Sequence, residues 1–304
     1  MGAVAGVFDL PDLDGWVLHR DDALSRSAGP WTWTDDQGTF LRRPTGSEDG
    51  LVLRAEGIAS AHISFYDRRI TLHGVAPRAD EALLEQFVSD QVLPRLLSHL
   101  GRLVVHAGAV EPELGRTILF VAPSGYGKST LTGYLHDSGW PLLGDDAILL
   151  HLLDGSVIAR SVYRRLKLLP DSFAWLFPTA SSPAPRIGRK VSIEVSRTEM
   201  VPALAGEEQH SVAALFFLSK PPPVGGCQVE RIAAAEACIY LVRSSFALDP
   251  TDVGQAGRRF LRFGAVANTV PSFRLAYRRD FGQLAQVRDA IRSALNISAA
   301  SEAQ

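Results

Sequence analysis

Residues 122–130, with the sequence APSGYGKST, restrict the local fold of this chain strongly. The continuous apolar run 117–122 before them is typical of a strand buried on both faces of a sheet, and the residues after them favour a helix that closes at Gly139. Gly125 and Gly127 allow the tight wrap in which successive N–H groups converge on one anion. The segment therefore predicts a phosphate-binding loop (P-loop). Its predicted binding residues are Ser124, Gly125, Tyr126, Gly127, Lys128, Ser129 and Thr130.

The chemistry of this loop predicts ATP and Mg²⁺ as cofactors. In such loops the lysine, here Lys128, reaches the β- and γ-phosphates, and the hydroxyl group, here of Ser129, ligates the metal. The helix that follows adds the positive end of its dipole. Ala122 replaces the first glycine of the strict pattern, Gly-x-x-x-x-Gly-Lys-Ser/Thr. A glycine-rich turn without a ligand is the alternative, but the flanking strand and helix favour a nucleotide site.

Two adjacent aspartates, Asp145 and Asp146, follow the apolar segment PLLG. An aspartate at the end of a strand beside the loop's own strand can hold Mg²⁺, and a second one can accept a proton from an attacking hydroxyl group. We expect both carboxylates at a strand end that faces a solvated cleft. Which aspartate has which role stays open, with Asp145 favoured as metal ligand together with Ser129, and Asp146 favoured as base. The alternative is a solvated turn.

Other polar residues are weaker candidates. His106 lies in RLVVHAGAV, which predicts a strand preceding the strand of the loop, and a histidine there is by itself more often a packed core residue. Arg164, Arg165 and Lys190 follow the aspartates and are candidates for contacts with a substrate or with a transferring phosphoryl group. A solvated basic face explains the arginines equally well.

The chain reads as two domains with a short tail. Strand-like segments at 31–34, 51–57, 61–67 and 69–75 predict a β-rich N-terminal domain over 1–95. A helix is expected over 79–100, kinked or restarted at Pro94. A catalytic domain is expected over 96–298, with a helix starting at Asp249 and Pro250, and 299–304 form a disordered tail.

Composition excludes several partners. The formal net charge is −2 over 304 residues, so no charge excess points to nucleic acid. The longest apolar runs are strand-sized, which argues against a membrane span. Only two cysteines occur, Cys227 and Cys238, which favours a reduced, cytoplasmic protein.

Three segments together resemble the HPr kinase/phosphorylase family: VHAGAV (105–110), APSGYGKST (122–130) and LLGDDAILL (142–150). The resemblance implies an α/β fold with a P-loop kinase core of the HPr kinase/phosphoenolpyruvate carboxykinase type. The N-terminal part is similar to that of HPr-kinase-like enzymes of lasso-peptide and other peptide-tailoring clusters. By this resemblance the catalytic residues are His106, Lys128, Asp145 and Asp146.

The chain also departs from that family. The stretch Glu-x-Arg-Gly-x-Gly, whose glutamate helps to hold the metal in the family, has no clear counterpart, and the nearest segment is VYRRLKLLP (162–170). The phosphorolysis loop is not recognisable either, which favours a kinase without phosphorylase activity.

The resemblance implies an ATP-dependent kinase that phosphorylates a serine of a peptide or protein, such as a lasso-type precursor peptide. The alternatives are a kinase for a small-molecule hydroxyl group and a non-catalytic nucleotide-binding scaffold. A homo-oligomer is compatible with the resemblance. The sequence does not identify the acceptor.

Overall fold

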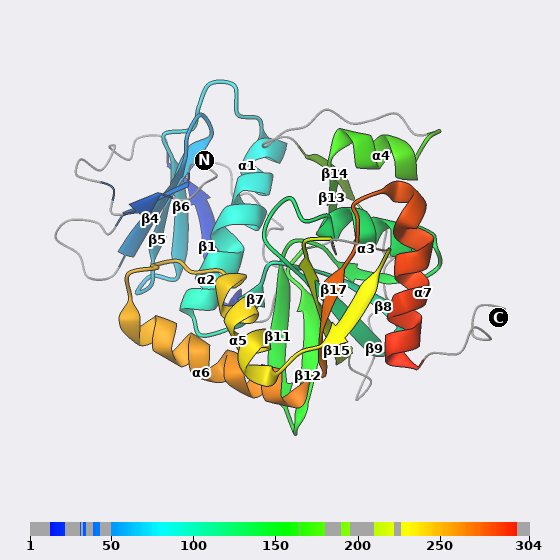
Figure 1. Cartoon of the computed structure of the whole chain (residues 1–304). Helices are drawn as coiled ribbons and strands as arrows, with labels where there is room; N and C mark the ends of the chain where they lie inside the picture. Colours follow the sequence, from blue (N-terminus) through cyan, green and yellow to red (C-terminus); the bar gives the residue numbers. More distant parts are fainter. Residues whose placement is uncertain are drawn as a thin grey trace. The chain divides into compact units, whose positions relative to one another are not determined.

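The computed structural model describes residues 13–21, 31, 33–34, 39–42, 50–163, 165–179, 190–194, 210–221 and 226–296. The fold is mixed α/β with several sheets (Figure 1). The chain divides into two compact units, Met1–Gly101 with Ala247–Val253, and Arg102–Phe246 with Gly254–Gln304. The tail 299–304 lies outside the described residues. No helix in the described ranges is long and apolar enough to cross a membrane.

The first unit contains a six-stranded sheet in the order β1-β6-β5-β4-β3-β2. β1 pairs with β6 in parallel and the other neighbours pair antiparallel. Burial alternates along β5, where Ala59, Ala61 and Ile63 are buried, as the period of two in a half-buried strand requires. The sequence had not indicated β1 or β3. The strands are β1 (Val17–Arg20), β2 (Trp33–Thr34), β3 (Thr39–Arg42), β4 (Gly50–Ala55), β5 (Ala59–Ser64) and β6 (Arg69–His73).

The helical part of this unit is interrupted before Pro94, as the sequence predicted. α1 (Glu81–Phe87) begins after Asp80, whose carboxylate accepts a hydrogen bond from the N–H of Leu83. A π-helical turn, η2 (Val88–Val92), follows, and α2 (Leu93–His99) contains Pro94 in its first turn. Proline has no backbone N–H. Its absence costs the helix little in the first turn, because the first N–H groups of a helix have no partner within the helix.

Nine of the described strands form the main sheet of the second unit. Its centre consists of three parallel strands, β9 (Arg116–Val121), β15 (Ser211–Ser219) and β17 (Ser272–Ala276). Parallel pairing brings the carboxyl ends of these strands to the same edge of the sheet. The remaining strands are β7 (Leu103–Val105), β8 (Ala107–Glu113), β10 (Leu142–Gly144), β11 (Ile148–Leu153), β12 (Ser156–Ser161) and β16 (Gln228–Arg231).

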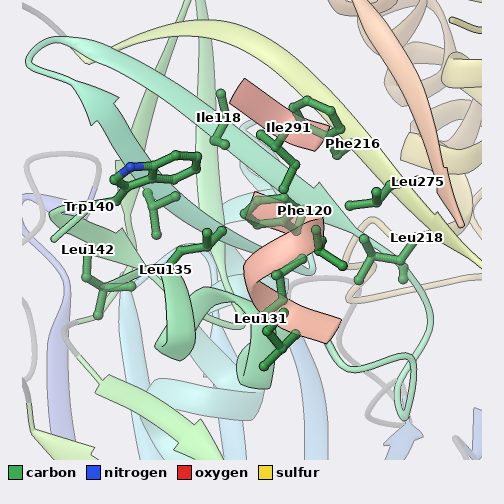
Figure 2. Packing of buried hydrophobic residues seen from close by; sticks show 14 of the residues in the cluster. Ile118, Phe120, Leu131, Leu135, Trp140, Leu142, Phe216, Leu218, Leu275 and Ile291 are labelled. Atoms are coloured by element: carbon green, nitrogen blue, oxygen red, sulfur yellow. The ribbon is translucent and has the colours of Figure 1, made fainter. Parts of the chain in front are cut away.

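Helices cover both faces of this sheet. α3 (Lys128–Asp137), α4 (Pro170–Leu176) and α7 (Leu284–Leu295) supply apolar side chains to the core on one face. α5 (Ala234–Arg243) and α6 (Val253–Thr269) supply them on the other. Figure 2 shows the first core, with Phe120 and Phe216 of the central strands facing Leu131 of α3 and Ile291 of α7.

The continuous apolar character of β9 is explained by this two-sided cover. Ile118 and Phe120 belong to the core on one face, and Leu119 and Val121 belong to the core on the other. A separate two-stranded sheet, β13 (Arg165–Leu168) with β14 (Val191–Glu194), packs against α3.

Several local expectations were wrong. The helix expected from Asp249 begins at Val253 instead, because the Asp249 carboxylate accepts hydrogen bonds from the N–H and hydroxyl of Thr251 and holds a turn. α4 and α5 lie where only strands and loops were expected.

Candidate functional site

The loop between β9 and α3 has the backbone conformation that its glycines permit. Gly125 and Gly127 have φ angles of 82° and 85°, in the left-handed region that side chains with a Cβ rarely adopt. α3 begins directly at Lys128, and its N-cap residue, Gly127, has no side chain that could cap the first turn. Its N-terminal N–H groups and the positive end of its dipole are therefore left to a ligand.

Lys128 is folded back onto this loop. Its Nζ donates hydrogen bonds to the carbonyl oxygens of Ala122 at 2.7 Å and Pro123 at 3.2 Å. Burial lowers the pKa of Lys128 to about 8, against the opposing effect of the Asp146 carboxylate. The cation is held at the start of the helix with little access to water.

A cavity of about 490 Å³ opens beside the loop, a volume within the range of small-ligand sites. Five cationic and two acidic side chains line it, so the cavity favours a polyanion. Leu169, Phe281 and Leu284 add an apolar part to its wall. Its charged residues are Lys128, Lys167, Lys190, Arg278, Arg279, Asp171 and Asp280.

Asp145 follows β10 at the same edge of the sheet. β10 and β9 are each antiparallel to β8, which lies between them, so β10 is not beside the strand of the loop as the sequence suggested. The two strands nevertheless run in the same direction. Their carboxyl ends therefore bring the aspartates and the loop together.

Asp145 does not face a solvated cleft, contrary to the expectation from sequence, because its side chain is fully buried. Its Oδ2 accepts the N–H of Lys167 at 3.1 Å, whereas Oδ1 has no hydrogen-bond partner in the described part of the chain. Burial and the adjacent Asp146 charge raise the pKa of Asp145 to about 6, although the nearby Ser129 hydroxyl lowers it in part. A buried carboxylate with an unsatisfied oxygen is suited to a cation.

Asp146 is held by three cationic or proton-donating side chains. Its Oδ1 lies 2.8 Å from Nε2 of His106 and 3.5 Å from Nζ of Lys190, and its Oδ2 lies 2.9 Å from Nζ of Lys167. Despite burial, Lys167 and His106 hold the pKa of Asp146 well below its ordinary value. Its φ angle of 73° is left-handed, which aspartate tolerates better than most residues. The two neighbouring carboxyl groups thus have opposite pKa shifts.

His106 lies in a break between β7 and β8, and not within one continuous strand as predicted. Its backbone N–H donates a hydrogen bond to the carbonyl oxygen of Ser244 at 2.7 Å. Burial and the Lys128 charge lower the pKa of His106, so the ring is neutral at neutral pH. Because Asp146 is ionised, Nε2 of His106 carries the ring proton and donates it in this hydrogen bond.

The structure brings most of the sequence candidates together. Lys128, Ser129, Asp145, Asp146 and His106 lie in contact or in electrostatic range of one another. Lys190 pairs with Asp146 and lines the cavity.

Other candidates have different surroundings. Ser124 is exposed and Tyr126 packs against the core. Thr130 lines the cavity, and its hydroxyl group forms a hydrogen bond with that of Ser172 at 2.9 Å. Arg165 is not among the described residues that line the cavity, and Arg164 lies outside the described residues.

Lys167, in the basic segment 162–170, pairs with Asp146. Sequence reasoning missed two arginines of the cavity. Arg278 and Arg279 follow β17, and the parallel alignment of that strand with β15 and β9 is the signal that would have placed them at the cavity. Arg279 donates a hydrogen bond to the carbonyl oxygen of Gly125.

Gly108 was also missed. A Cβ at this position of β8 would lie 2.1 Å from Oγ1 of Thr132 and 3.4 Å from Oδ1 of Asp145. The absence of a side chain therefore allows β8 to approach α3 and Asp145 closely.

The residues present fit a magnesium-bound nucleotide. Ser129 and the unsatisfied Oδ1 of Asp145 are the oxygens that would hold the metal, and the lysines of the cavity would hold the phosphates. No group of three or more His, Cys, Asp or Glu side chains able to hold a metal occurs within the described ranges. Two protein ligands suit Mg²⁺, which keeps water and phosphate oxygens in its coordination shell.

Comparison with known proteins gave structural neighbours but no relative in sequence. No family model matches the chain, and no curated protein is similar to it in sequence. Among solved structures, the Hpr(Ser) kinase/phosphatase from Coxiella burnetii matches with 16% sequence identity and a TM-score of 0.32, covering 63% of this chain and 89% of that chain. A likeness at this level says nothing about the activity of this chain.

Proposed function

We propose that this protein binds ATP with Mg²⁺ through residues 124–130 and transfers the γ-phosphoryl group to a hydroxyl group. One observation carries the proposal: Lys128 and Ser129, at the start of α3, lie beside the carboxylates of Asp145 and Asp146. A loop that binds phosphates has no need of two neighbouring carboxylates unless a metal or a proton is also handled there.

Lys128, the first turn of α3 and the arginines after β17 bind the phosphates in this proposal. Ser129 and Asp145 hold the metal. Bound Mg-ATP supplies an electrophilic γ-phosphorus and a leaving group, ADP. The bond from the acceptor oxygen to that phosphorus forms as the bond to the β–γ bridging oxygen breaks, and the hydroxyl proton passes to a carboxylate. Arg278 and Arg279 add positive charge to the same cavity.

Asp146 is the favoured base because it is ionised and lies where His106 and Lys167 orient it. Its lowered pKa makes it a weak base while Lys167 and His106 remain in place. Asp145 has the raised pKa, but its unsatisfied oxygen beside Ser129 suits a metal ligand better.

The acceptor class comes from the sequence. The resemblance of residues 105–110, 122–130 and 142–150 to the HPr kinase/phosphorylase family, and of residues 1–95 to HPr-kinase-like enzymes of peptide-tailoring clusters, supports a serine on a peptide or protein. An acceptor of that kind would leave a phosphoserine on a protein or a tailored peptide.

Isothermal titration of Mg-ATP into the full chain and into Lys128→Ala tests the nucleotide site. Loss of one charge-assisted contact should weaken binding by about 10- to 100-fold. Arg116→Ala is the matched control, because Arg116 lies at the other end of β9 and pairs with Glu113 on the surface. Equal ATP affinity in the wild type and Lys128→Ala would refute the nucleotide site.

Transfer is tested separately with γ-labelled ATP and a library of serine-containing peptides, analysed by mass spectrometry. A gain of one phosphoryl group on peptides, lost in Asp146→Asn, is the expected result. ATP binding without any acceptor phosphorylation, for peptides and for small alcohols alike, would favour a nucleotide-binding scaffold.

A further inference from the structure

Both oxygens of Asp146 are occupied, and not in the same way. Oδ1 is shared by His106 and Lys190, at 2.8 Å and 3.5 Å. Oδ2 is held at 2.9 Å by Lys167, which is its only partner among the described residues. Lys167 therefore competes with an acceptor hydroxyl group for Oδ2, and its charge makes that oxygen a poorer proton acceptor while the ion pair is in place.

Lys167 is placed between the carboxylate and the cavity. Its side chain is 7% exposed, and the residue lines the cavity together with Lys128 and Ser129, whereas Asp146 is not among the described residues that line it. The same Nζ donates to the hydroxyl oxygen of Tyr163 at 3.1 Å and lies 4.8 Å from the centre of that ring. An ammonium group on a flexible four-carbon chain can exchange one anion for another with little movement of the backbone.

We propose that Lys167 exchanges Asp146 for the terminal phosphate of a bound nucleoside triphosphate, and that this exchange frees Oδ2 as the proton acceptor. The inference rests on the proposed function. A terminal phosphate carries more negative charge than one carboxylate and offers more acceptor oxygens, so it attracts the ammonium group more strongly. A diphosphate lacks the group that draws Lys167 away.

Lys190 cannot perform this exchange. Its Nζ is 3.5 Å from Oδ1, its side chain is 31% exposed, and His106 still occupies Oδ1 if Lys190 leaves. Lys190 is therefore the matched control for Lys167: a second lysine, on the same carboxylate and lining the same cavity.

The exchange would make proton transfer from the acceptor depend on binding of the nucleoside triphosphate. The acceptor hydroxyl group meets a free carboxylate oxygen only after a triphosphate is bound. Lys167, in turn, neutralises charge on the group being transferred.

The test is the ratio of affinities for the non-hydrolysable triphosphate AMP-PNP and for ADP, both with Mg²⁺, measured by isothermal titration on the full chain. Lys167→Met should weaken AMP-PNP binding by about tenfold and leave ADP binding within about twofold. Lys190→Met should change both affinities by similar, smaller factors. Asp146→Asn should tighten AMP-PNP binding by a few-fold, because Lys167 then has no carboxylate to give up.

The exchange predicts that the ratio of AMP-PNP affinity to ADP affinity falls in Lys167→Met and rises in Asp146→Asn. Equal weakening of AMP-PNP and ADP binding in Lys167→Met, or no change in either, would overturn it. If Lys167→Met does not fold, Asp146→Asn decides alone, and an unchanged ratio overturns the exchange. Failure of the proposed function is a different result, in which Lys128→Ala binds AMP-PNP as the wild type does or the wild type binds neither nucleotide.

Discussion

Replacing Asp145 with asparagine should stabilise the fold while it weakens magnesium-dependent nucleotide binding. Asp145 is fully buried, one of its oxygens has no partner among the described residues, and a second negative charge lies next to it in the chain. Asparagine has the same shape, keeps an oxygen that can accept the N–H of Lys167, and carries no charge. If Asp145 holds the metal as proposed, its carboxylate serves that role at the expense of stability.

The size of the effect follows from proton linkage. The unfolded chain has an ordinary carboxyl pKa of 3.8, and burial with the Asp146 charge raises the pKa of folded Asp145 to about 6. The folded state therefore binds this proton more tightly. The charged carboxylate therefore destabilises the folded state. This effect is absent at a pH below the pKa of Asp145 in the unfolded chain, and it is complete at a pH above its pKa in the folded protein. At about 1.4 kcal/mol for each pH unit, it reaches about 3 kcal/mol above pH 6 and about half of that at pH 5.

The unmade hydrogen bonds of the new amide group offset about 1 kcal/mol of this gain. We therefore expect the free energy of unfolding of Asp145→Asn to exceed that of the wild type by about 1–3 kcal/mol at pH 8, and by clearly less at pH 5. Urea denaturation followed by tryptophan fluorescence measures both values. Buried Trp140, in the same unit as Asp145, is one reporter.

The neighbouring aspartate is the control. The pKa of Asp146 is lowered, so its charge contributes stability above the unfolded pKa that is lost as the pH falls towards the folded pKa. Asp146→Asn should therefore destabilise the protein at pH 8. A destabilised Asp145→Asn at pH 8, or a gain that is equal at pH 5 and pH 8, would refute the reasoning.

Two further predictions concern the close approach at β8 and the buried lysine. Gly108→Ala should unfold at lower temperature than the wild type and bind Mg-ATP more weakly, because its Cβ would lie 2.1 Å from Oγ1 of Thr132; wild-type values in a thermal melt and a titration would contradict this. In NMR spectra of lysine-labelled protein, one resonance should titrate near pH 8 and be missing in Lys128→Ala, since burial lowers that pKa. Titration of every lysine above pH 10 would contradict it.

Local sequence was sufficient to predict the strand, loop and helix at 117–137. The conformation of this segment depends on neighbours in the chain: apolar residues for a strand buried on both faces, glycines for left-handed φ angles, and a helix that starts at Lys128. The same holds for the break at Pro94 and for the position of the aspartates directly after a short strand. Expectations failed where two local signals competed, as at Asp249, which forms a turn instead of starting a helix.

The surroundings of the two aspartates depended on the tertiary structure. Asp145 and Asp146 are adjacent and of the same type, so their sequence neighbours do not distinguish them. In the structure, burial raises the pKa of Asp145, whereas Lys167 and His106 lower the pKa of Asp146. His106 lies 40 positions before Asp146 in the chain, and Lys190 lies directly before β14. The strength of a charge interaction depends on the distance between the two groups and on their burial. A sequence pattern contains neither the distance nor the burial. The sequence by itself determined where a glycine-rich loop with the pattern of a phosphate-binding loop and two carboxylates would stand along the chain. Only the packing of β10, β13 and β17 around that loop decided which carboxylate is charged and which cations face it.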